Sequence, residues 1–391
     1  MAKNLEHLTI HQFRGLKNLE LRDLGTINLL VGVNNSGKTS VLEAIATYCQ
    51  PLDPKAWLNT AWSREIKFSR KPQLDALRWL FPQNQQETSQ QVIISGEGAF
   101  QLRKLQANYE EIEGTVSQNN TEETIEGVFD QNEREEEIED EVFSDELIER
   151  GADLSLKAET VVPLDLFANK TVEKTFRLWE GQRSIFGKKR SDLVLPVETI
   201  SPFSHRIEQL QVKSLSNAIK QQFKSEIIEL LQNLDQGIIG LEILSTSRDR
   251  KERLYINHKD IGVAPLSAFG DGVRRLLYIA STLVQAKGGV LLIDELESSI
   301  HTEVLDRSFT WLIKACQEMK VQLFATTHSL EAVDALLQSI EARENLNGDN
   351  NSSKDFVLYR LEGENGKNLA RRFNSEKLHI LREELGQEVR W

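Results

Sequence analysis

The sequence predicts an α/β fold built on a parallel sheet, because three apolar segments each end in a cluster of small or polar residues. Residues 27–31 lead into a glycine-containing loop, residues 290–293 end at Asp294 and Glu295, and residues 321–326 end at a Thr-His-Ser cluster. Buried parallel strands have nearly continuous apolar runs and deliver the residues that follow them to one edge of the sheet. We therefore expect a functional site where these strand ends meet.

The first of these segments carries the most specific pattern. The eight residues 32–39, Gly-Val-Asn-Asn-Ser-Gly-Lys-Thr, fit the phosphate-loop pattern G-x-x-x-x-G-K-[ST], and residues 40–48 have the apolar spacing of a helix. Glycine lets the backbone curl so that several N–H groups point inward, and the positive end of the following helix adds to this anion nest. The pattern predicts a nucleotide phosphate site; the alternative is an ordinary glycine turn.

Each residue type in this loop has an expected role. Lys38 would reach the β- and γ-phosphates, and the Thr39 hydroxyl would ligate Mg²⁺. Asp294 would hold the same Mg²⁺, mostly through water, and Glu295 would polarise the attacking water. The predicted nucleotide-binding residues of the loop are Gly32, Asn34, Asn35, Ser36, Gly37, Lys38, Thr39 and Ser40.

Three further positions are candidates, each with an alternative. Ser267, with Gly270 and Gly272, forms a Ser/Gly turn that opens a helix; it is either a second anion site, which another subunit would offer to the γ-phosphate, or an ordinary helix cap. His328 either senses the γ-phosphate, as a catalytic residue, or is structural. Arg14, in the turn after the first strand, either contacts the nucleotide phosphates or is a solvated turn residue.

Composition places the chain among globular proteins. It has 391 residues, of which 39% are hydrophobic and 27% charged, enough for two or three lobes with a good core. No apolar run is long enough to span a membrane, and the N-terminus has no signal-peptide core, so we expect no membrane association. Cys49 and Cys316 are expected to be buried thiols, which favours a cytoplasmic location.

The net charge of −13 comes from one segment. Residues 110–149 contain 17 acidic residues and one basic residue, a net charge of −16, so the rest of the chain is close to neutral. We expect much of 110–150 to be mobile, as a solvated insertion or as a nucleic-acid mimic or docking tail for a basic partner. No Lys/Arg run marks a nucleic-acid surface, which argues weakly against nucleic-acid binding and leaves it open.

The pattern along the chain predicts two parts. Residues 1–55 and 238–391 would form the nucleotide-binding head, with an N-terminal antiparallel β subdomain and a mixed central sheet, and residues 56–237 would form an inserted α+β lobe. The expected elements are strands over 5–10, 18–21, 27–31, 91–94, 100–103, 154–156, 174–179, 238–244, 253–256 and 356–361, helices over 73–81 and 204–234, and a final helix near the C-terminus.

Five segments together resemble the ABC-type ATPase heads of the SMC, RecF and OLD (overcoming lysogenization defect) group: FRGLKNLEL, GVNNSGKTS, LSAFGDGVRRLL, VLLIDELESSIH and ATTHS. The likeness is greatest to the stand-alone AAA15, or OLD-like, ATPases, covers about 1–50 and 238–391, and includes the ending at 385–390. It implies a Walker A loop at 32–39, Walker B residues Asp294 and Glu295, a signature loop at Ser267, and His328 as a switch histidine. Ser298, Ser299 and His301 would face a dimer interface.

By this resemblance, two heads would sandwich two ATP molecules with Mg²⁺, as a homodimer or higher homo-oligomer. The SMC-type coiled coil is absent from the pattern, and too few residues follow His328 for the TOPRIM nuclease domain of full-length OLD proteins. The expected function is therefore a slow ATPase switch for a separate effector protein, such as a nuclease, in bacterial anti-phage defence. The alternatives are a RecF-like DNA-binding repair ATPase and, with less support, a transporter ATPase subunit.

Overall fold

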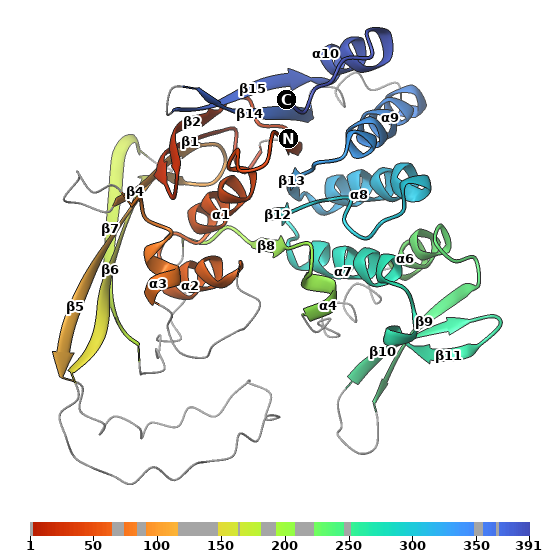
Figure 1. Cartoon of the computed structure of the whole chain (residues 1–391), viewed down its shortest axis with the longest axis horizontal. Helices are drawn as coiled ribbons and strands as arrows, with labels where there is room; N and C mark the ends of the chain where they lie inside the picture. Colours follow the sequence, from red (N-terminus) through yellow and green to blue (C-terminus); the bar gives the residue numbers. More distant parts are fainter. Residues whose placement is uncertain are drawn as a thin grey trace.

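The computed structural model describes residues 3–64, 74–83, 91–115, 148–162, 165–180, 193–207, 223–245, 252–347, 355–364 and 367–391. In this part of the chain, two six-stranded sheets and one three-stranded sheet are packed against helices (Figure 1). The α/β class and the mixed central sheet predicted from the sequence are confirmed.

The central sheet has the strand order β15-β14-β3-β13-β12-β8. Five strands are parallel and β15 is an antiparallel edge strand. The strands are β3 (Ile27–Val31), β8 (Val197–Ile200), β12 (Val290–Ile293), β13 (Gln322–Thr326), β14 (Phe356–Glu364) and β15 (Lys367–Asn374). Every residue of β3, β12 and β13 is buried, which is why their sequences are almost continuously apolar.

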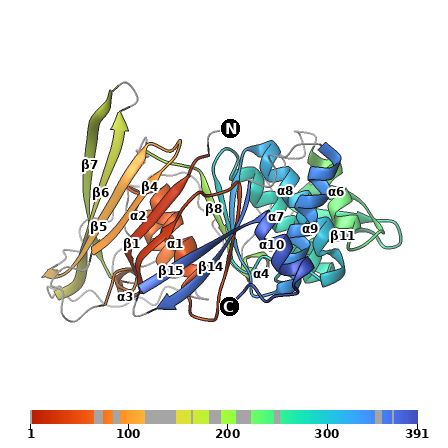
Figure 2. The same ribbon diagram turned by 90° about the horizontal axis from the view of Figure 1, so that it is seen from above.

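Alternate residues of these strands face two different hydrophobic cores. Leu29 and Val31 face the core built with α6, α7, α8 and α9, whereas Leu30 faces the core that contains α1. The helices of the first core are α6 (Phe223–Gln232), α7 (Asp271–Gln285), α8 (Leu305–Met319) and α9 (Leu330–Asn347); those of the second are α1 (Lys38–Cys49), α2 (Pro54–Trp62) and α3 (Leu74–Arg78). Helices thus cover both faces of the central sheet (Figure 2).

The second large sheet is antiparallel, with the order β2-β1-β4-β5-β6-β7. Its strands are β1 (His7–Phe13), β2 (Leu16–Leu21), β4 (Gln91–Glu97), β5 (Leu102–Thr115), β6 (Ile148–Val162) and β7 (Asp165–Trp179). Helix α1 shares its core with this sheet, and the Tyr48 hydroxyl of α1 donates to the Leu102 carbonyl at 2.6 Å. The N-terminal strands β1 and β2 and the strands β4 to β7 of the predicted insert therefore form a single sheet.

The third sheet, β11-β10-β9, adjoins α6 and α7. It comprises β9 (Ile238–Ser245), β10 (Glu252–His258) and β11 (Gly262–Pro265), followed by the 3₁₀ turn η1 (Leu266–Ala268). The remaining short elements are α4 (Ser204–Ile207), the 3₁₀ turn η2 (Thr302–Val304), α10 (Ser375–His379) and the π-helical turn η4 (Ile380–Glu384). Residues 385–391 follow without helix, and the predicted final helix corresponds to α10 and η4.

Two strands of the central sheet differ from the sequence predictions. Strand β8 lies in the predicted insert yet pairs with β12 of the central sheet, and β15 has no counterpart among the predicted strands. The division into a head and an inserted lobe stays a prediction. Within the acidic segment, 110–115 and 148–150 are strand, and 116–147 lies outside the described residues, as does 208–222 of the predicted helix.

Two predictions from composition can also be compared with the structure. Cys49 in α1 and Cys316 in α8 are free and buried, as predicted, and burial raises the pKa of both thiols. Among the described residues, no helix is long and apolar enough to cross a membrane.

Candidate nucleotide-binding site

The ends of β3, β12 and β13 meet at one edge of the central sheet, as expected. The strands are parallel neighbours, with Thr326 paired with Leu30 and Ile293 paired with Ala325. This register places the loop after β3 beside the residues that follow the other two strands. The predicted phosphate loop, the acidic pair and the Thr-His-Ser cluster therefore come from three adjacent strand ends.

The phosphate loop has the backbone that its glycines predict. Gly32 and Gly37 have φ values of 150° and 96°, and Asn35 between them has a φ of 64°. A Cβ atom on Gly32 would lie 2.6 Å from the Ser36 Oγ and 2.7 Å from the Leu361 carbonyl oxygen, so a larger residue would displace the loop. The buried Ser36 Oγ has no hydrogen-bond partner among the described residues, which leaves it available to a ligand.

Lys38 folds back over the loop at the start of α1. Its Nζ donates to the carbonyl oxygens of Gly32 at 2.8 Å and Val33 at 3.0 Å. Burial lowers the pKa of Lys38, while Asp294, Glu295 and Glu297 act in the opposite direction. Helix α1 begins without a side-chain cap, so no capping side chain occupies its first N–H groups, and the anion nest stays a prediction.

Asp294 is fixed by hydroxyl groups from two other elements. The Thr39 Oγ1 donates to Asp294 Oδ2 at 3.0 Å, and the Thr326 Oγ1 donates to Asp294 Oδ1 at 2.5 Å. The Thr326 Oγ1 also accepts the Glu295 N–H at 2.9 Å. In the sequence, Thr326 ends an apolar segment and has no assigned role, because only the pairing of β12 with β13 brings it to the acidic pair.

This oxygen-only arrangement fits Mg²⁺. Mg²⁺ takes oxygen ligands, and proteins supply only one or two of them while phosphates and waters supply the rest. Within the described ranges, no group of three or more His, Cys, Asp or Glu side chains could hold a metal alone. Thr39 and Asp294 are therefore the residues that would hold Mg²⁺ together with a bound nucleotide.

Glu295 occupies a strained and partly desolvated position. Its φ is 50°, a left-handed conformation that residues with side chains rarely adopt. Burial raises the pKa of Glu295, and the nearby carboxylates of Asp294 and Glu297 raise it further. A carboxylate with a raised pKa is a stronger base, which suits the predicted role toward water.

A buried arginine that the sequence did not single out links α7 to the acidic pair. Arg275 has no exposed surface, and its Nη2 donates to the carbonyl oxygens of Asp294 and Glu295, each at 3.2 Å. Its Nη1 donates to the carbonyl oxygen of Ser201, just after β8. Burial lowers the pKa of Arg275 to about 10, so it remains charged at neutral pH.

His328 has an exposed side chain and a fixed backbone. Its N–H donates to Glu297 Oε1 at 3.1 Å, and its carbonyl oxygen accepts a hydrogen bond from Arg390 Nη1 at 2.7 Å. Neither Glu297 nor Arg390 was a candidate from the sequence, since Glu297 comes beside His328 through the pairing of β12 with β13 and Arg390 through the packing of the C-terminal tail.

Arg14 is not the solvated turn residue that one of its two sequence-based alternatives describes. Its side chain is 13% exposed, and its guanidinium contacts the Glu43 carboxylate of α1 at 2.7 Å and donates to the Trp79 carbonyl at 3.2 Å. Glu43 also accepts two hydrogen bonds from Arg64, whose Nη2 donates to the Ser40 Oγ at 3.0 Å. A role of Arg14 at the nucleotide stays a prediction.

The predicted signature turn lies at η1 and the start of α7. Ser267 is exposed in η1, and the cap of α7 is Gly270 rather than Ser267, with no capping side-chain hydrogen bond. In the described part of the chain, no hydrogen bond or ion pair joins Ser267, Gly270 or Gly272 to the phosphate loop. A Cβ atom on Gly272 would lie 3.1 Å from the Ser299 carbonyl oxygen, so this turn packs against the predicted interface segment instead.

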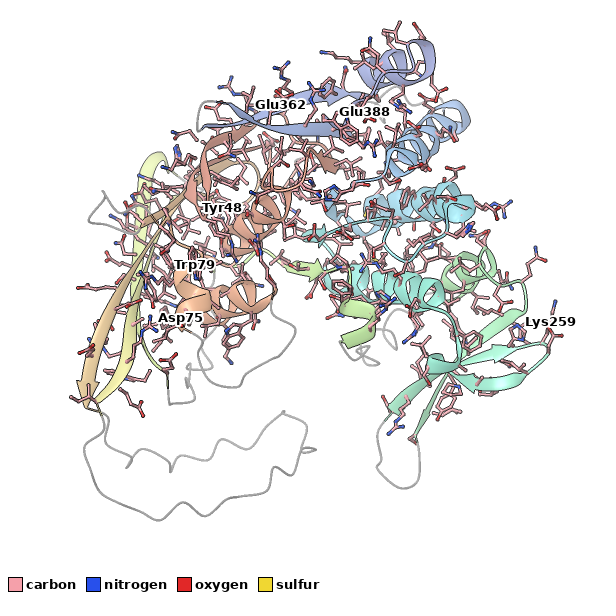
Figure 3. The ribbon with its side chains drawn as sticks, in the orientation of Figure 1. Tyr48, Asp75, Trp79, Lys259, Glu362 and Glu388 are labelled. Carbon is pink, nitrogen blue, oxygen red and sulfur yellow. The ribbon has the colours of Figure 1, made fainter. Side chains whose placement is uncertain are left out.

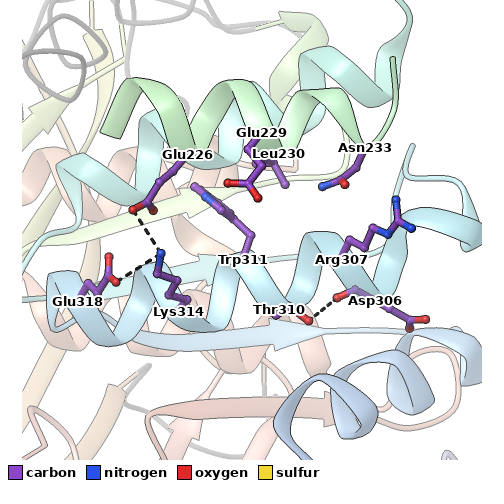
Figure 4. A pocket seen from close by; sticks show the side chains of 10 residues that line it. All are labelled: Glu226, Glu229, Leu230, Asn233, Asp306, Arg307, Thr310, Trp311, Lys314 and Glu318. Atoms are coloured by element: carbon purple, nitrogen blue, oxygen red, sulfur yellow. Dashed lines mark hydrogen bonds and ion pairs between the residues drawn. The ribbon is translucent and has the colours of Figure 1, made fainter. Parts of the chain in front are cut away.

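A separate groove lies between α6 and α8, with a volume of about 720 Å³ (Figure 4). Trp311 lies in its wall, and Lys314 of α8 forms an ion pair with Glu226 of α6 across it and another with Glu318 along α8. None of the predicted nucleotide-site residues lines this groove, so we do not assign it to the nucleotide.

The sheet order, the phosphate loop and the acidic pair are those of an α/β protein with a P-loop at the edge of its central sheet. The chain belongs to the AAA_21 family, described as "AAA domain, putative AbiEii toxin, Type IV TA system", whose model matches residues 27–334.

Individual relatives match over shorter stretches. A Helicobacter pylori protein named ATP/GTP phosphatase is 26% identical over 158 residues, which are 39% of this chain and 40% of that protein. The DNA replication and repair protein RecF of Nitrosococcus oceani is 52% identical over 42 residues, 11% of this chain and 12% of that protein. A solved Smc head bound to the C-winged helix domain of ScpA has a TM-score of 0.49 and 13% identity, covering 96% of this chain and 100% of that chain.

Proposed function

We propose that this protein binds and slowly hydrolyses ATP, and that an ATP-sandwich dimer of it controls a separate effector protein. The observation that carries the proposal is the Asp294 carboxylate held between the hydroxyl of Thr39, at the phosphate loop, and that of Thr326. If Asp294 had only a structural role, it would have no reason to lie beside a phosphate loop. The combination supports a site built for a Mg²⁺–nucleotide.

The residues of the chain would divide the chemistry as follows. Bound ATP and Mg²⁺ would supply the phosphoryl group and neutralise its charge. The loop amides and Lys38 would bind the phosphates, while Thr39 and Asp294 would hold the metal. Glu295 would accept a proton from the water that attacks the γ-phosphorus, and His328 would donate a hydrogen bond to the γ-phosphate.

The proposed second half of each site comes from another copy of the chain. Ser267 and Gly270 are exposed and have no interaction with their own phosphate loop in the described residues. The same holds for the interface candidates Ser299 and His301, which are exposed at the end of the loop after β12. The turn at Ser267 could therefore bind the γ-phosphate only if a second copy of the chain brought its own bound nucleotide to it.

The biological setting that we propose is bacterial defence. The family description mentions a toxin of a Type IV toxin–antitoxin system, which fits a defence role more readily than a housekeeping one. Together with the sequence resemblance to AAA15, or OLD-like, ATPases, this favours control of an effector such as a nuclease in bacterial anti-phage defence. A cytoplasmic location goes with this proposal.

A hydrolysis assay tests the core of the proposal. Mg²⁺-dependent phosphate release by the full chain should be lost, by at least about 100-fold, in Lys38→Ala, because its contacts with the transferred phosphoryl group disappear. Lys259→Ala, which changes an exposed lysine (labelled in Figure 3), is the matched control and should keep full activity. Undiminished phosphate release from Lys38→Ala would contradict the proposed site.

The RecF-like alternative has one specific observation in its favour, the 52% identity to RecF over 42 residues. It predicts duplex DNA binding that weakens steeply as salt rises, and hydrolysis that DNA stimulates. A gel-shift titration at low salt, followed by hydrolysis with and without duplex DNA, separates the two functions. Absence of both effects would remove the alternative.

A further inference from the structure

The backbone of His328 is held from both sides by charged side chains. Glu297 Oε1 accepts hydrogen bonds from the N–H groups of His328 at 3.1 Å and Ser329 at 3.2 Å. On its C-terminal side, Arg390 Nη1 donates to the His328 carbonyl oxygen at 2.7 Å. Glu297 follows the acidic pair by two residues, so one side of this clamp belongs to the nucleotide site and the other to the C-terminal tail.

Arg390 is itself rigidly placed. Its Nε and Nη2 form a bidentate pair with the Glu388 carboxylate, at 2.8 and 2.7 Å, which leaves Nη1 for His328. The same carboxylate accepts the N–H groups of Val389 and Arg390, at 3.1 and 2.9 Å. Val389 between them is 1% exposed and belongs to the core beneath α9. The guanidinium is therefore oriented before any ligand binds.

Further contacts hold the tail, residues 385–391, against the head. Arg382 forms a bidentate pair with Asp334 of α9, at 2.7 and 2.8 Å, and donates to the Gln387 carbonyl at 2.6 Å. Arg360 of β14 donates to the carbonyl oxygen of Trp391 at 3.2 Å. Figure 3 shows Glu388 of the tail next to β14 and α10. The tail is thus a docked element of the head.

We propose that Arg390 is a positioning residue for His328, and that the C-terminal tail is a structural part of the nucleotide site. The inference rests on the proposed function, in which the His328 imidazole acts on the γ-phosphate. The imidazole is exposed, so its position depends on its backbone, and that backbone is hydrogen-bonded to both Glu297 and Arg390. A short displacement of a positioned hydrogen-bond donor is enough to lose much of its effect on the transition state.

A double-mutant cycle in the full chain tests the coupling. We expect Arg390→Met to lower kcat about 10-fold with KM for ATP within about twofold, and to have no further effect when His328 is already alanine. Arg390→Lys, which can still donate to the carbonyl but cannot pair bidentately with Glu388, should lose less activity. Arg371→Met, which changes an exposed arginine of β15, is the matched control and should behave as wild type.

A measurement of amide hydrogen exchange keeps this test separate from the proposed function. Peptides containing His328 and Ser329 should exchange faster in Arg390→Met, while peptides from the phosphate loop should not change. If the wild type hydrolyses no ATP, the proposed function fails and the exchange data still decide the positioning role. Equal losses of kcat in the wild-type and His328→Ala backgrounds, or unchanged exchange at His328, would overturn the inference.

Discussion

A single threonine hydroxyl joins the two acidic residues of the site. Thr326 donates to Asp294 and accepts the Glu295 N–H, and it has no exposed surface. The hydroxyl therefore orients a metal-ligand carboxylate and the backbone of the proposed base at once. Replacing Thr326 by valine, which has nearly the same shape, removes these hydrogen bonds while keeping the packing.

We expect Thr326→Val to weaken Mg²⁺ use without unfolding the protein. The valine would leave the Glu295 N–H unpaired, which costs about 1–3 kcal/mol of folding free energy, and would free one Asp294 oxygen. The Mg²⁺ concentration that gives half-maximal hydrolysis should rise about 10-fold, as measured by a Mg²⁺ titration at saturating ATP. Thr310→Val in α8, remote from the site, is the control; an unchanged titration of Thr326→Val would contradict this role.

The raised pKa of Glu295 has a consequence for pH dependence. Glu295 can accept a proton only when it is ionised, so kcat/KM should fall as the pH falls through its pKa. Because burial and two neighbouring carboxylates raise that pKa, the midpoint of the acid limb should lie above the ordinary value of 4.5. A pH profile of kcat/KM checks this, with Glu295→Gln as a variant that should lack the limb. A midpoint at or below 4.5 would contradict the assignment.

Among the elements, α7 is joined to the site through Arg275. This residue is the only one of the two adjacent arginines that is buried, and it binds backbone carbonyls after β8 and β12. Arg274 beside it is 30% exposed and pairs with Asp271 at the start of α7. The helix that carries the predicted signature turn is therefore tied to the acidic pair of the same chain.

Arg275→Met should destabilise the fold and Arg274→Met should not. The buried methionine would remove the guanidinium hydrogen bonds to three carbonyl oxygens, of which those of Ser201 and Glu295 keep a backbone N–H donor. We expect a loss of about 2–4 kcal/mol in the free energy of unfolding. Loss of the partly exposed Arg274 pair should cost less than about 1 kcal/mol. Urea denaturation followed by circular dichroism measures both variants. Equal stabilities of the two variants would show that Arg275 does not hold α7 in place.

The elements also show where sequence reasoning succeeds and where it stops. Strands β3, β12 and β13 could be predicted because burial on both faces leaves an almost continuous apolar run. The phosphate loop could be predicted because its glycines adopt positive φ values that other residues rarely adopt. Strand β8 carries a half-buried pattern and gives no such signal, although it completes the sheet. Arg275 and Arg390 bind the backbone carbonyl oxygens of other residues, and such contacts leave no pattern in the local sequence.

At the scale of the whole molecule, the sandwich proposal makes a prediction about mass. Glu295→Gln would bind ATP without removing the proton from water, so closed dimers should accumulate with ATP and Mg²⁺. Light scattering coupled to size-exclusion chromatography should show twice the monomer mass with ATP and the monomer with ADP. A variant that stays monomeric at saturating ATP would contradict the sandwich.

Mixing two inactive variants tests whether one site is built from two copies. Lys38→Ala and Ser267→Arg should each be inactive alone, since every site in either homodimer lacks one half. In a mixed dimer, the phosphate loop of the Ser267→Arg copy meets the intact turn of the Lys38→Ala copy, so one site of the two is complete. Random pairing makes half of the dimers mixed, and the mixture should recover about a quarter of wild-type activity.

The matched control replaces one partner by the double variant Lys38→Ala/Ser267→Arg. Mixed with Ser267→Arg, this double variant offers no intact turn to any phosphate loop, so no activity should return. A site closed within one chain makes the opposite prediction, because mixing could then never combine the two halves. Since Ser267 is exposed and has no interaction with its own phosphate loop in the described residues, we expect recovery in the first mixture and none in the second.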